Sequence, residues 1–221
     1  MEMKISRQFT LVSLHPERGW IRDSSSSFRF ALAAAALMDF YLLGEISEEN
    51  KRLTPSPRHN GDPFHDRLID LLGGSAKPRK ILYWIRKLSW KSRQNLQESL
   101  SIFVSNGTIR YEKRYFLGLF SYDRYYFIDP GIRSSIITNL RDIVINGRSP
   151  SDEQLMLLAL IKATNSLKYL ASDYGERSVI RGRVRELFKN DEYASKYQKF
   201  ARLIISSVTA ATAASESSYV A

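Results

Sequence analysis

The sequence predicts a mainly α-helical protein, a single helical-bundle-like domain from which one β-hairpin protrudes. Apolar residues recur at helical spacing in several segments, and one segment is apolar on almost every side. Residues 109–128 instead alternate in places and are rich in β-branched and aromatic side chains, as strands are. No repeat and no linker divides the chain, so we expect one domain over residues 1–221, with a disordered tail at 215–221.

The first segments lead into a buried helix. Residues 6–22 are expected to form a short helix or an extended strand, with a turn at Pro16–Gly19. Asp23 and the serine run at 24–27 are typical N-cap residues for the helix "FRFALAAAALMDFYLLGEI". Because this helix is apolar nearly all round, we expect it in the middle of the protein.

Three more helices are expected before the hairpin. Residues 48–61 are polar and rich in Pro, Asn and Gly, which indicates a surface loop. A helix then begins at Asp62 with Pro63 in its first turn, and it ends at Gly73–Gly74. The next two are expected over 77–90 and 92–105. Their inward faces are Ile81, Trp84, Ile85 and Leu88 in the first, and Leu96, Leu100 and Phe103 in the second.

The hairpin runs from Ile109 to Ile128, and its midpoint falls at Gly118. A turn at Tyr122–Asp123 is the alternative. With the midpoint at Gly118, an apolar group lies at or beside the tip, namely Phe116, Leu117, Leu119 and Phe120.

The remainder of the chain is expected to be helical. A stripe over 136–144 ends at Gly147, and Ser151 with Gln154 forms a capping box for a helix over 152–171. A short basic helix over 177–188 and a last helix over 193–214 follow.

The net charge of +10 and the isoelectric point of about 9.8 favour an anionic partner: nucleic acid, an anionic membrane or an acidic protein. A solvated basic face without a ligand is the plainer alternative. The strongest feature is residues 75–97, which contain no Asp or Glu. Their cations are Lys77, Arg79, Lys80, Arg86, Lys87, Lys91 and Arg93.

Several classes of site find no support in the sequence. The chain has no cysteine, so it has neither disulfides nor thiolate metal ligands. No nucleophile elbow, P-loop or dinucleotide fingerprint occurs, so we expect a non-enzymatic protein without a cofactor. His59, Asp62, His65 and Asp66 suit a metal by type, but a helix N-terminus explains them better, and no metal site is expected.

The hydropathy of the sequence indicates how the protein could meet a membrane. The N-terminus lacks the apolar core of a signal peptide, and the longest apolar stretch is interrupted by Asp39 and is too short to span a bilayer. We therefore expect a cytoplasmic protein that meets a membrane, if at all, from the side.

The apolar tip bears on the choice of partner. Helix, helix, hairpin is also the order in winged-helix DNA binders, but apolar side chains gain nothing against a phosphate backbone. In a lipid interface each buried Leu or Phe would contribute roughly 1.5–3 kcal/mol, and a basic patch supplies the second signal that peripheral proteins need. Three alternatives stay open: the tip packs into the chain's own core, it packs into a second subunit, or the basic segment binds nucleic acid.

Several motifs together resemble a known family. "ERGW" precedes "SSSSFRFALAAAALMDFYLLGEI", and "GDPFHDRLIDLL", "YWIRKL", "SNGTIRYEK", "LLALIKATNSL" and "RGRVRELF" follow in order. From about Phe9 to Ala211 this resembles the Golgi phosphoprotein 3 family. The short loop after "WIRKL" is similar to bacterial-type members. The resemblance implies a mainly helical domain that binds phosphatidylinositol 4-phosphate on Golgi membranes. It also implies a hydrophobic hairpin for membrane insertion and self-association, hence a possible homo-oligomer, and possible protein cargo.

The family's headgroup pocket uses a Trp and an Arg near the start of the buried helix and two basic residues before the hairpin. Counting without gaps places these positions at Ser24, Ala33, Arg93 and Leu96, so only Arg93 matches. Arg29 precedes Ala33 by one turn on the same face, and Trp20 is nearby in sequence. The resemblance therefore predicts that the headgroup is held by Arg93, Arg29, Lys91 and Trp20, while Phe116, Leu117, Leu119 and Phe120 contact the membrane or another subunit.

Overall fold

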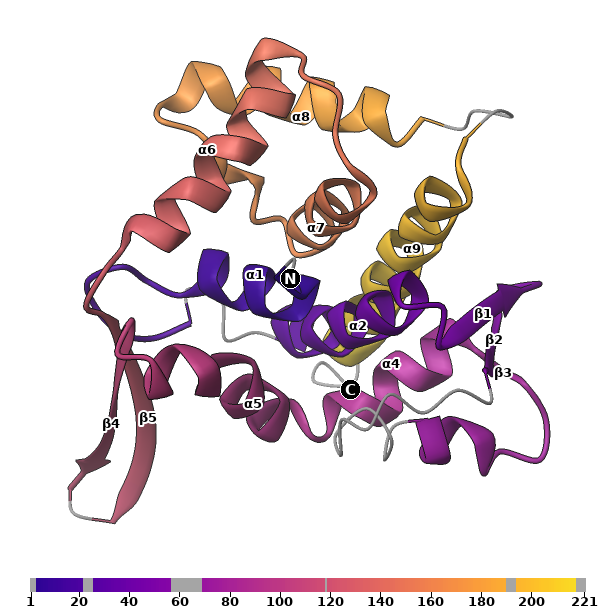
Figure 1. The fold of residues 1–221 in the computed structure, drawn as a ribbon, viewed down its shortest axis with the longest axis horizontal. Helices are drawn as coiled ribbons and strands as arrows, with labels where there is room; N and C mark the ends of the chain where they lie inside the picture. Colours follow the sequence, from indigo (N-terminus) through magenta and orange to yellow (C-terminus); the bar gives the residue numbers. More distant parts are fainter. Residues whose placement is uncertain (1–2, 22–25, 57–68, 118, 190–193, 218–221) are drawn as a thin grey trace.

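Helix α2 (Ser26–Leu42) lies at the centre of the fold because it is apolar on almost every side. In the computed structural model its residues from Ala31 to Met38 are all buried. Figure 1 shows other helices around it on several sides. It packs against α1 (Ile5–Ser13), α4 (Ile81–Ser89), α5 (Ser92–Ser105), α7 (Asp152–Ala163) and α9 (Lys196–Ser217).

The structure describes residues 3–21, 26–56, 69–117, 119–189 and 194–217. The mainly α-helical class with one protruding hairpin is confirmed. Of the expected N-cap residues, Asp23, Ser24 and Ser25 lie outside the described residues, and Ser26 and Ser27 are the first two residues of α2. The short helix expected near the N-terminus is α1, and α2 ends at Leu42, four residues before the predicted end of the buried helix at Ile46.

Asp39 joins the central helix to α1. Its side chain is 5% exposed, and its two carboxylate oxygens accept hydrogen bonds from the backbone N–H groups of Ile5 (2.6 Å) and Ser6 (3.2 Å). These N–H groups lie in the first turn of α1, where no backbone acceptor is available within the helix. Burial raises the pKa of Asp39 to about 6, although the Ser6 hydroxyl and the two backbone N–H groups oppose that shift.

A small three-stranded sheet corrects the prediction of a plain loop at 48–61. Strand β1 (Ile46–Glu49) pairs antiparallel with β2 (Arg52–Pro55), and β2 pairs with β3 (Arg79–Lys80). Asn50 and Lys51 connect β1 and β2 with φ values of 51° and 61°, as a tight hairpin turn requires. Since only Ile46 and Leu53 in β1 and β2 are buried, these strands lack an apolar pattern long enough to read from sequence.

The two helices predicted between this sheet and the hairpin are present, but the first begins at Ile81 and not at Lys77, since Arg79 and Lys80 form β3. In α4, Ile81, Trp84, Ile85 and Leu88 are buried, and in α5, Leu100 and Phe103 are buried while Leu96 is half-buried. Of the helix predicted from Asp62, residues 69–73 are helical and residues 57–68 lie outside the described part.

A second layer covers α1 and α7. It consists of α6 (Gly131–Asn146), the 3₁₀ helix η1 (Leu167–Leu170) and α8 (Tyr174–Leu187), seen at the top of Figure 1. The helix predicted over 152–171 ends instead at Ala163, because Asn165 takes a left-handed conformation with φ 54°. Helix α9 extends to Ser217, so 215–217 belong to a helix and not to the predicted tail, while 218–221 are outside the described residues.

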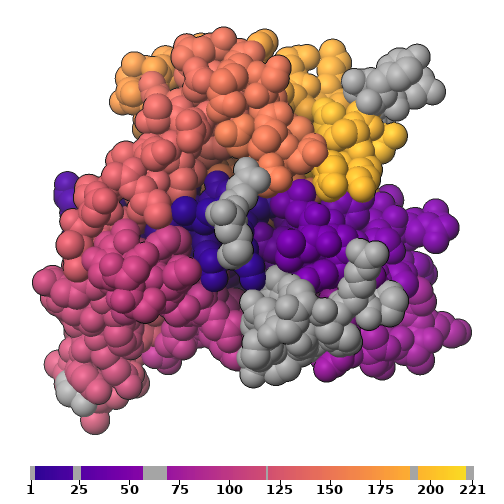
Figure 2. Space-filling view, viewed as in Figure 1, coloured from indigo at the N-terminus to yellow at the C-terminus, as the bar shows by residue number. Residues whose placement is uncertain are grey.

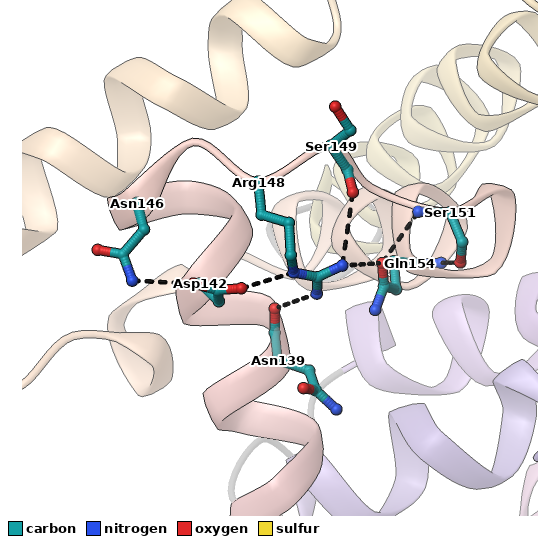
Figure 3. Close-up of polar contacts among 7 residues, drawn as sticks. All are labelled: Asn139, Asp142, Asn146, Arg148, Ser149, Ser151 and Gln154. Atoms are coloured by element: carbon teal, nitrogen blue, oxygen red, sulfur yellow. Dashed lines mark hydrogen bonds and ion pairs between the residues drawn. The ribbon is translucent and has the colours of Figure 1, made fainter.

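Arg148 fixes the turn between α6 and α7 (Figure 3). Its guanidinium donates to the Asp142 carboxylate at 2.6 Å and to the backbone oxygen of Asn139 at 3.1 Å. The predicted capping box is confirmed. The Gln154 N–H donates to the Ser151 hydroxyl at 3.3 Å, and the Ser151 N–H donates to the Gln154 side chain at 2.9 Å.

The hairpin extends away from the body at the lower left of Figures 1 and 2. Its strands are β4 (Ile109–Phe116) and β5 (Phe120–Phe127), and the last pair before the turn is Phe116 with Phe120. This register confirms the midpoint at position 118. The alternative turn at Tyr122–Asp123 is wrong, because both residues lie within β5.

No helix in the described part of the chain is both long enough and apolar enough to cross a bilayer.

Candidate functional site

A cavity of about 530 Å³ lies between the base of the hairpin, the first turn of α2 and the start of α5. We call it the hairpin pocket. Three of the residues predicted to hold a headgroup, Trp20, Arg29 and Arg93, line it together. The other residues around it are Gly19, Ile21, Phe28, Ser92, Leu96, Tyr122, Asp123, Arg124 and Tyr125.

The loop that carries Trp20 is fixed to the hairpin. The Tyr125 N–H donates to the Gly19 carbonyl at 2.8 Å, and the His15 N–H donates to the Trp20 carbonyl at 2.7 Å. Gly19 has φ 64°, and a Cβ there would come within 2.9 Å of the Tyr126 ring. Only glycine therefore suits both the conformation and the close approach.

Two aromatic rings and a guanidinium form one wall of the hairpin pocket. Arg124 lies 5.0 Å from the ring centre of Trp20 and 4.8 Å from that of Tyr122, within the range of cation–π attraction. Trp20 remains 43% exposed, so its ring is held in place and still accessible from outside.

Arg93 is already engaged by a carboxylate. Its guanidinium donates to both oxygens of Asp123 at 3.0 and 3.2 Å, and the Tyr111 hydroxyl donates to the same carboxylate at 2.8 Å. Partial burial of Asp123 favours its neutral form, but hydrogen bonds from Arg93 and Tyr111 outweigh it and lower the pKa. Asp123 is thus charged at neutral pH, and it partly neutralises Arg93.

Positive charge nevertheless dominates the hairpin pocket. Arg29, Arg93 and Arg124 line it, and Asp123 is the one acid among the described residues around it. Within the described part of the chain, Arg29 forms no ion pair and its side chain is exposed. Guanidinium groups bind phosphate through paired N–H donors, so the arrangement suits a phosphate-bearing ligand.

Ala33, where counting without gaps puts the family's Arg position, does not line the cavity. Ala33 is completely buried in α2, whereas Arg29, one turn earlier, lies on the surface and lines the cavity. Leu96 also lines it, while Ser24 lies outside the described residues. Lys91 is exposed in the turn between α4 and α5 but does not line the hairpin pocket.

The basic segment 75–97 does not form a single site. Arg79 and Lys80 belong to β3, at the opposite side of Figure 1 from the hairpin. Helix α4 runs from that sheet toward α5, and of the seven cations only Arg93, in α5, lines the hairpin pocket. The segment thus divides into a sheet-side group and a pocket-side group.

Sequence reasoning missed the contribution of β5. Tyr122 and Arg124 lie two residues apart on one strand and therefore on the same face, and Asp123 reaches α5 through Arg93. The signal for this contribution in the sequence was a basic residue between aromatic residues in the second strand. Only the packing of the hairpin base against Gly19 shows which face of that strand lines the pocket.

The hairpin tip is exposed. Phe116, Leu117, Leu119 and Phe120 are 61–80% exposed, whereas Ile109 and Tyr125 at the base are buried. The alternative that the tip packs into the chain's own core is therefore wrong. Such a contiguous exposed apolar group is typical of an interaction site.

Of the residues described, no group of three His, Asp or Glu side chains gathers where it could hold a metal ion. The sequence cluster His59, Asp62, His65 and Asp66 lies outside the described residues.

Comparison with known proteins identifies one family. The profile of the family described as Golgi phosphoprotein 3 (GPP34) matches residues 5–204, which is most of the chain and includes the hairpin pocket and the hairpin. No curated protein matches the chain.

Proposed function

The chain belongs to the Golgi phosphoprotein 3 family, and we propose that it is a non-enzymatic, peripheral membrane protein that binds anionic lipid. The ligand class we propose is a phosphoinositide, of which phosphatidylinositol 4-phosphate is the family's example. The observation that carries the proposal is the hairpin itself, which has an exposed apolar tip and contributes Tyr122, Asp123 and Arg124 to a cationic pocket at its base.

The tip supplies the apolar part of the binding energy. Each of its four large side chains is at least 61% exposed. Full burial of one such side chain contributes roughly 1.5–3 kcal/mol, so inserting the exposed parts of all four contributes roughly 4–9 kcal/mol. This energy is available only in an apolar environment such as the interfacial region of a bilayer.

The hairpin pocket supplies the electrostatic part. Arg29 is unpaired within the described residues, and Arg93 can exchange Asp123 for a phosphate. Lys91 lies outside the pocket wall and would contribute through its field. Binding that combines a cationic surface with apolar insertion depends on both anionic lipid and an accessible bilayer.

Vesicle co-sedimentation tests the proposal. We expect the protein to sediment with phosphatidylcholine vesicles that contain phosphatidylinositol 4-phosphate or phosphatidylserine, and to stay in solution with phosphatidylcholine alone. Stronger binding to vesicles with phosphatidylinositol 4-phosphate than to vesicles with phosphatidylserine would support a phosphoinositide as the ligand. Equal binding to neutral and anionic vesicles would overturn the electrostatic half of the proposal.

Tip variants test the apolar half. Phe116→Ser with Phe120→Ser should weaken vesicle binding at least tenfold without lowering the midpoint of thermal unfolding, since both rings are exposed. Leu117→Asn is the sharper variant because Leu117 has φ 51°, a conformation that Asn tolerates better than Leu. It should reduce binding while leaving stability unchanged or higher; unchanged binding would refute insertion of the tip.

Further measurements would show whether the same surfaces bind other partners. Steeply salt-dependent filter binding to nucleic acid, without vesicle binding, would favour the winged-helix alternative. A change in oligomeric state by light scattering in the Phe116→Ser, Phe120→Ser variant would indicate that the tip contacts a second copy. Protein cargo is the third possibility left by the family resemblance.

A further inference from the structure

A second cavity, of about 630 Å³, lies on the other side of Arg29. We call it the corner pocket because it lies at the corner between α4 and α5, where the start of α2 and the end of α9 meet them. Arg29 and Ser92 line both cavities, so the corner pocket and the hairpin pocket are neighbours on one surface. Neither the family match nor the sequence comparison assigns a role to it.

The corner pocket brings together donors for an anion and a flat aromatic ring. Arg86 and Trp90 are four residues apart, so they lie on the same side of the chain at the end of α4. Both line the cavity together with Arg29 from α2. Trp90 is 90% exposed, an unusual position for the largest apolar side chain.

The remaining walls leave room and add hydroxyl groups. Helix α9 contributes the small residues Ala211, Ala214 and Ser215, and α4 and α5 contribute Ser89 and Ser92. Among the described residues, no Asp or Glu lines the cavity. Neither Arg29 nor Arg86 forms an ion pair within the described part of the chain, so both guanidiniums are available to a ligand.

From this arrangement we infer that the corner pocket is a second binding site for a phosphate-bearing group. Arg29 and Arg86 hold the phosphate, and the face of Trp90 covers a ring or glycerol unit attached to it. The cavity is larger than a bare phosphate needs and falls in the size range of sites for small organic ligands. The inference extends the proposed lipid binding, because Arg29 is shared with the hairpin pocket; the phosphate belongs either to a lipid headgroup or to a free solute.

Tryptophan fluorescence can report on this site directly. In a Trp20→Phe background the tryptophans left are Trp90, which is exposed, and Trp84, which is 1% exposed and shielded from direct contact with a ligand. The probe is soluble inositol 1,4-bisphosphate. We expect a saturable change in Trp90 emission, and about a tenfold weaker affinity after Arg86→Gln, which removes one charged donor.

Lys87→Gln is the matched control. It removes the same charge from the next residue of α4, but the Lys87 amine lies over the Tyr83 and Trp84 rings, and the residue lines neither cavity. Its affinity for the probe should stay close to that of the background protein. No saturable change in Trp90 emission, or a change that survives Arg86→Gln, would overturn the inference.

Vesicles with bromine-labelled acyl chains then separate the two sources of phosphate. Quenching of Trp90 by anionic labelled vesicles indicates a lipid headgroup, whereas a response to the soluble probe without quenching indicates a free solute; both support a phosphate site. The two proposals fail differently. Vesicle binding without any change in Trp90 emission on adding the probe would refute the proposed site in the corner pocket but not lipid binding. A change in Trp90 emission on adding the probe, without vesicle binding, would refute lipid binding but not the site in the corner pocket.

Discussion

Asp39 offers a quantitative test of how burial and helix capping compete. Its carboxylate is 5% exposed, which favours the neutral acid, but it accepts two N–H hydrogen bonds from the first turn of α1, which favour the anion. Burial is the larger effect, so the pKa rises from 3.8 to about 6. The perturbation we propose is Asp39→Asn, which keeps the shape and removes the titration.

The shift fixes the sign and size of the pH dependence. Because the folded pKa is above the unfolded pKa, the native state binds more protons between the two values, and the free energy of unfolding falls as pH rises. The contribution is complete below about pH 4 and is lost as pH rises through about 6. A shift of about two pH units corresponds to about 3 kcal/mol at 1.36 kcal/mol per unit.

Urea unfolding of both proteins at several pH values measures this contribution. The stability of the wild type minus that of Asp39→Asn should fall by about 3 kcal/mol between about pH 4 and pH 7, since the other titrating groups cancel. The substitution should therefore be relatively better tolerated at neutral than at acid pH. Either a flat or a rising difference would refute the reasoning: a flat one would mean that the hydrogen bonds to Asp39 balance burial, and one that rises with pH would mean that they outweigh it.

Three further substitutions test local features. Ser151→Ala removes the N-cap of α7 and should cost about 1 kcal/mol in urea unfolding; no loss would mean that the capping box is energetically idle. Gly19→Ala introduces a Cβ within 2.9 Å of the Tyr126 ring at φ 64°, so the free energy of unfolding should fall by more than about 1 kcal/mol; equal stability would contradict the close approach. Asp123→Asn releases Arg93 from its ion pair and should raise affinity for anionic vesicles several-fold; weaker binding would show that Asp123 orients Arg93 for the ligand instead of competing with it.

Much of the fold could be predicted because its signals are local. The stripe from Ile81 to Leu88, the capping box at Ser151 and the midpoint at Gly118 each depend on residues close together in sequence. The β1–β2 hairpin could not be predicted, because its turn at Asn50–Lys51 joins strands that together bury only two side chains. There the rest of the fold, and not the local pattern, decides the structure.

The pocket was predicted in part, and the limit has a physical cause. Sequence reasoning named Trp20, Arg29 and Arg93, but it could not tell which turn of the apolar helix reaches the surface. The first turn of α2 does, because the helix is buried on every side only from Ala31 to Phe40, which is why Arg29 is exposed and Ala33 is not. The exposure of Trp90 could not be predicted either. Trp90 lies outside the buried stripe of α4, but the sequence does not show whether a neighbouring element covers it.

The hairpin connects the two halves of the proposed function. Its tip carries the apolar side chains, while β5 contributes Asp123 and Arg124 to the pocket. The base is fixed to the body by the Tyr125–Gly19 hydrogen bond and by the Arg93–Asp123 ion pair, so the strand that lines the pocket also sets the direction of the tip. A ligand that draws Arg93 away from Asp123 removes one of these two constraints. Headgroup binding and tip insertion should therefore be coupled, and a double-mutant cycle between Arg93→Gln and Leu117→Asn should give non-additive losses of vesicle affinity. Additive losses would mean that the pocket and the tip act independently.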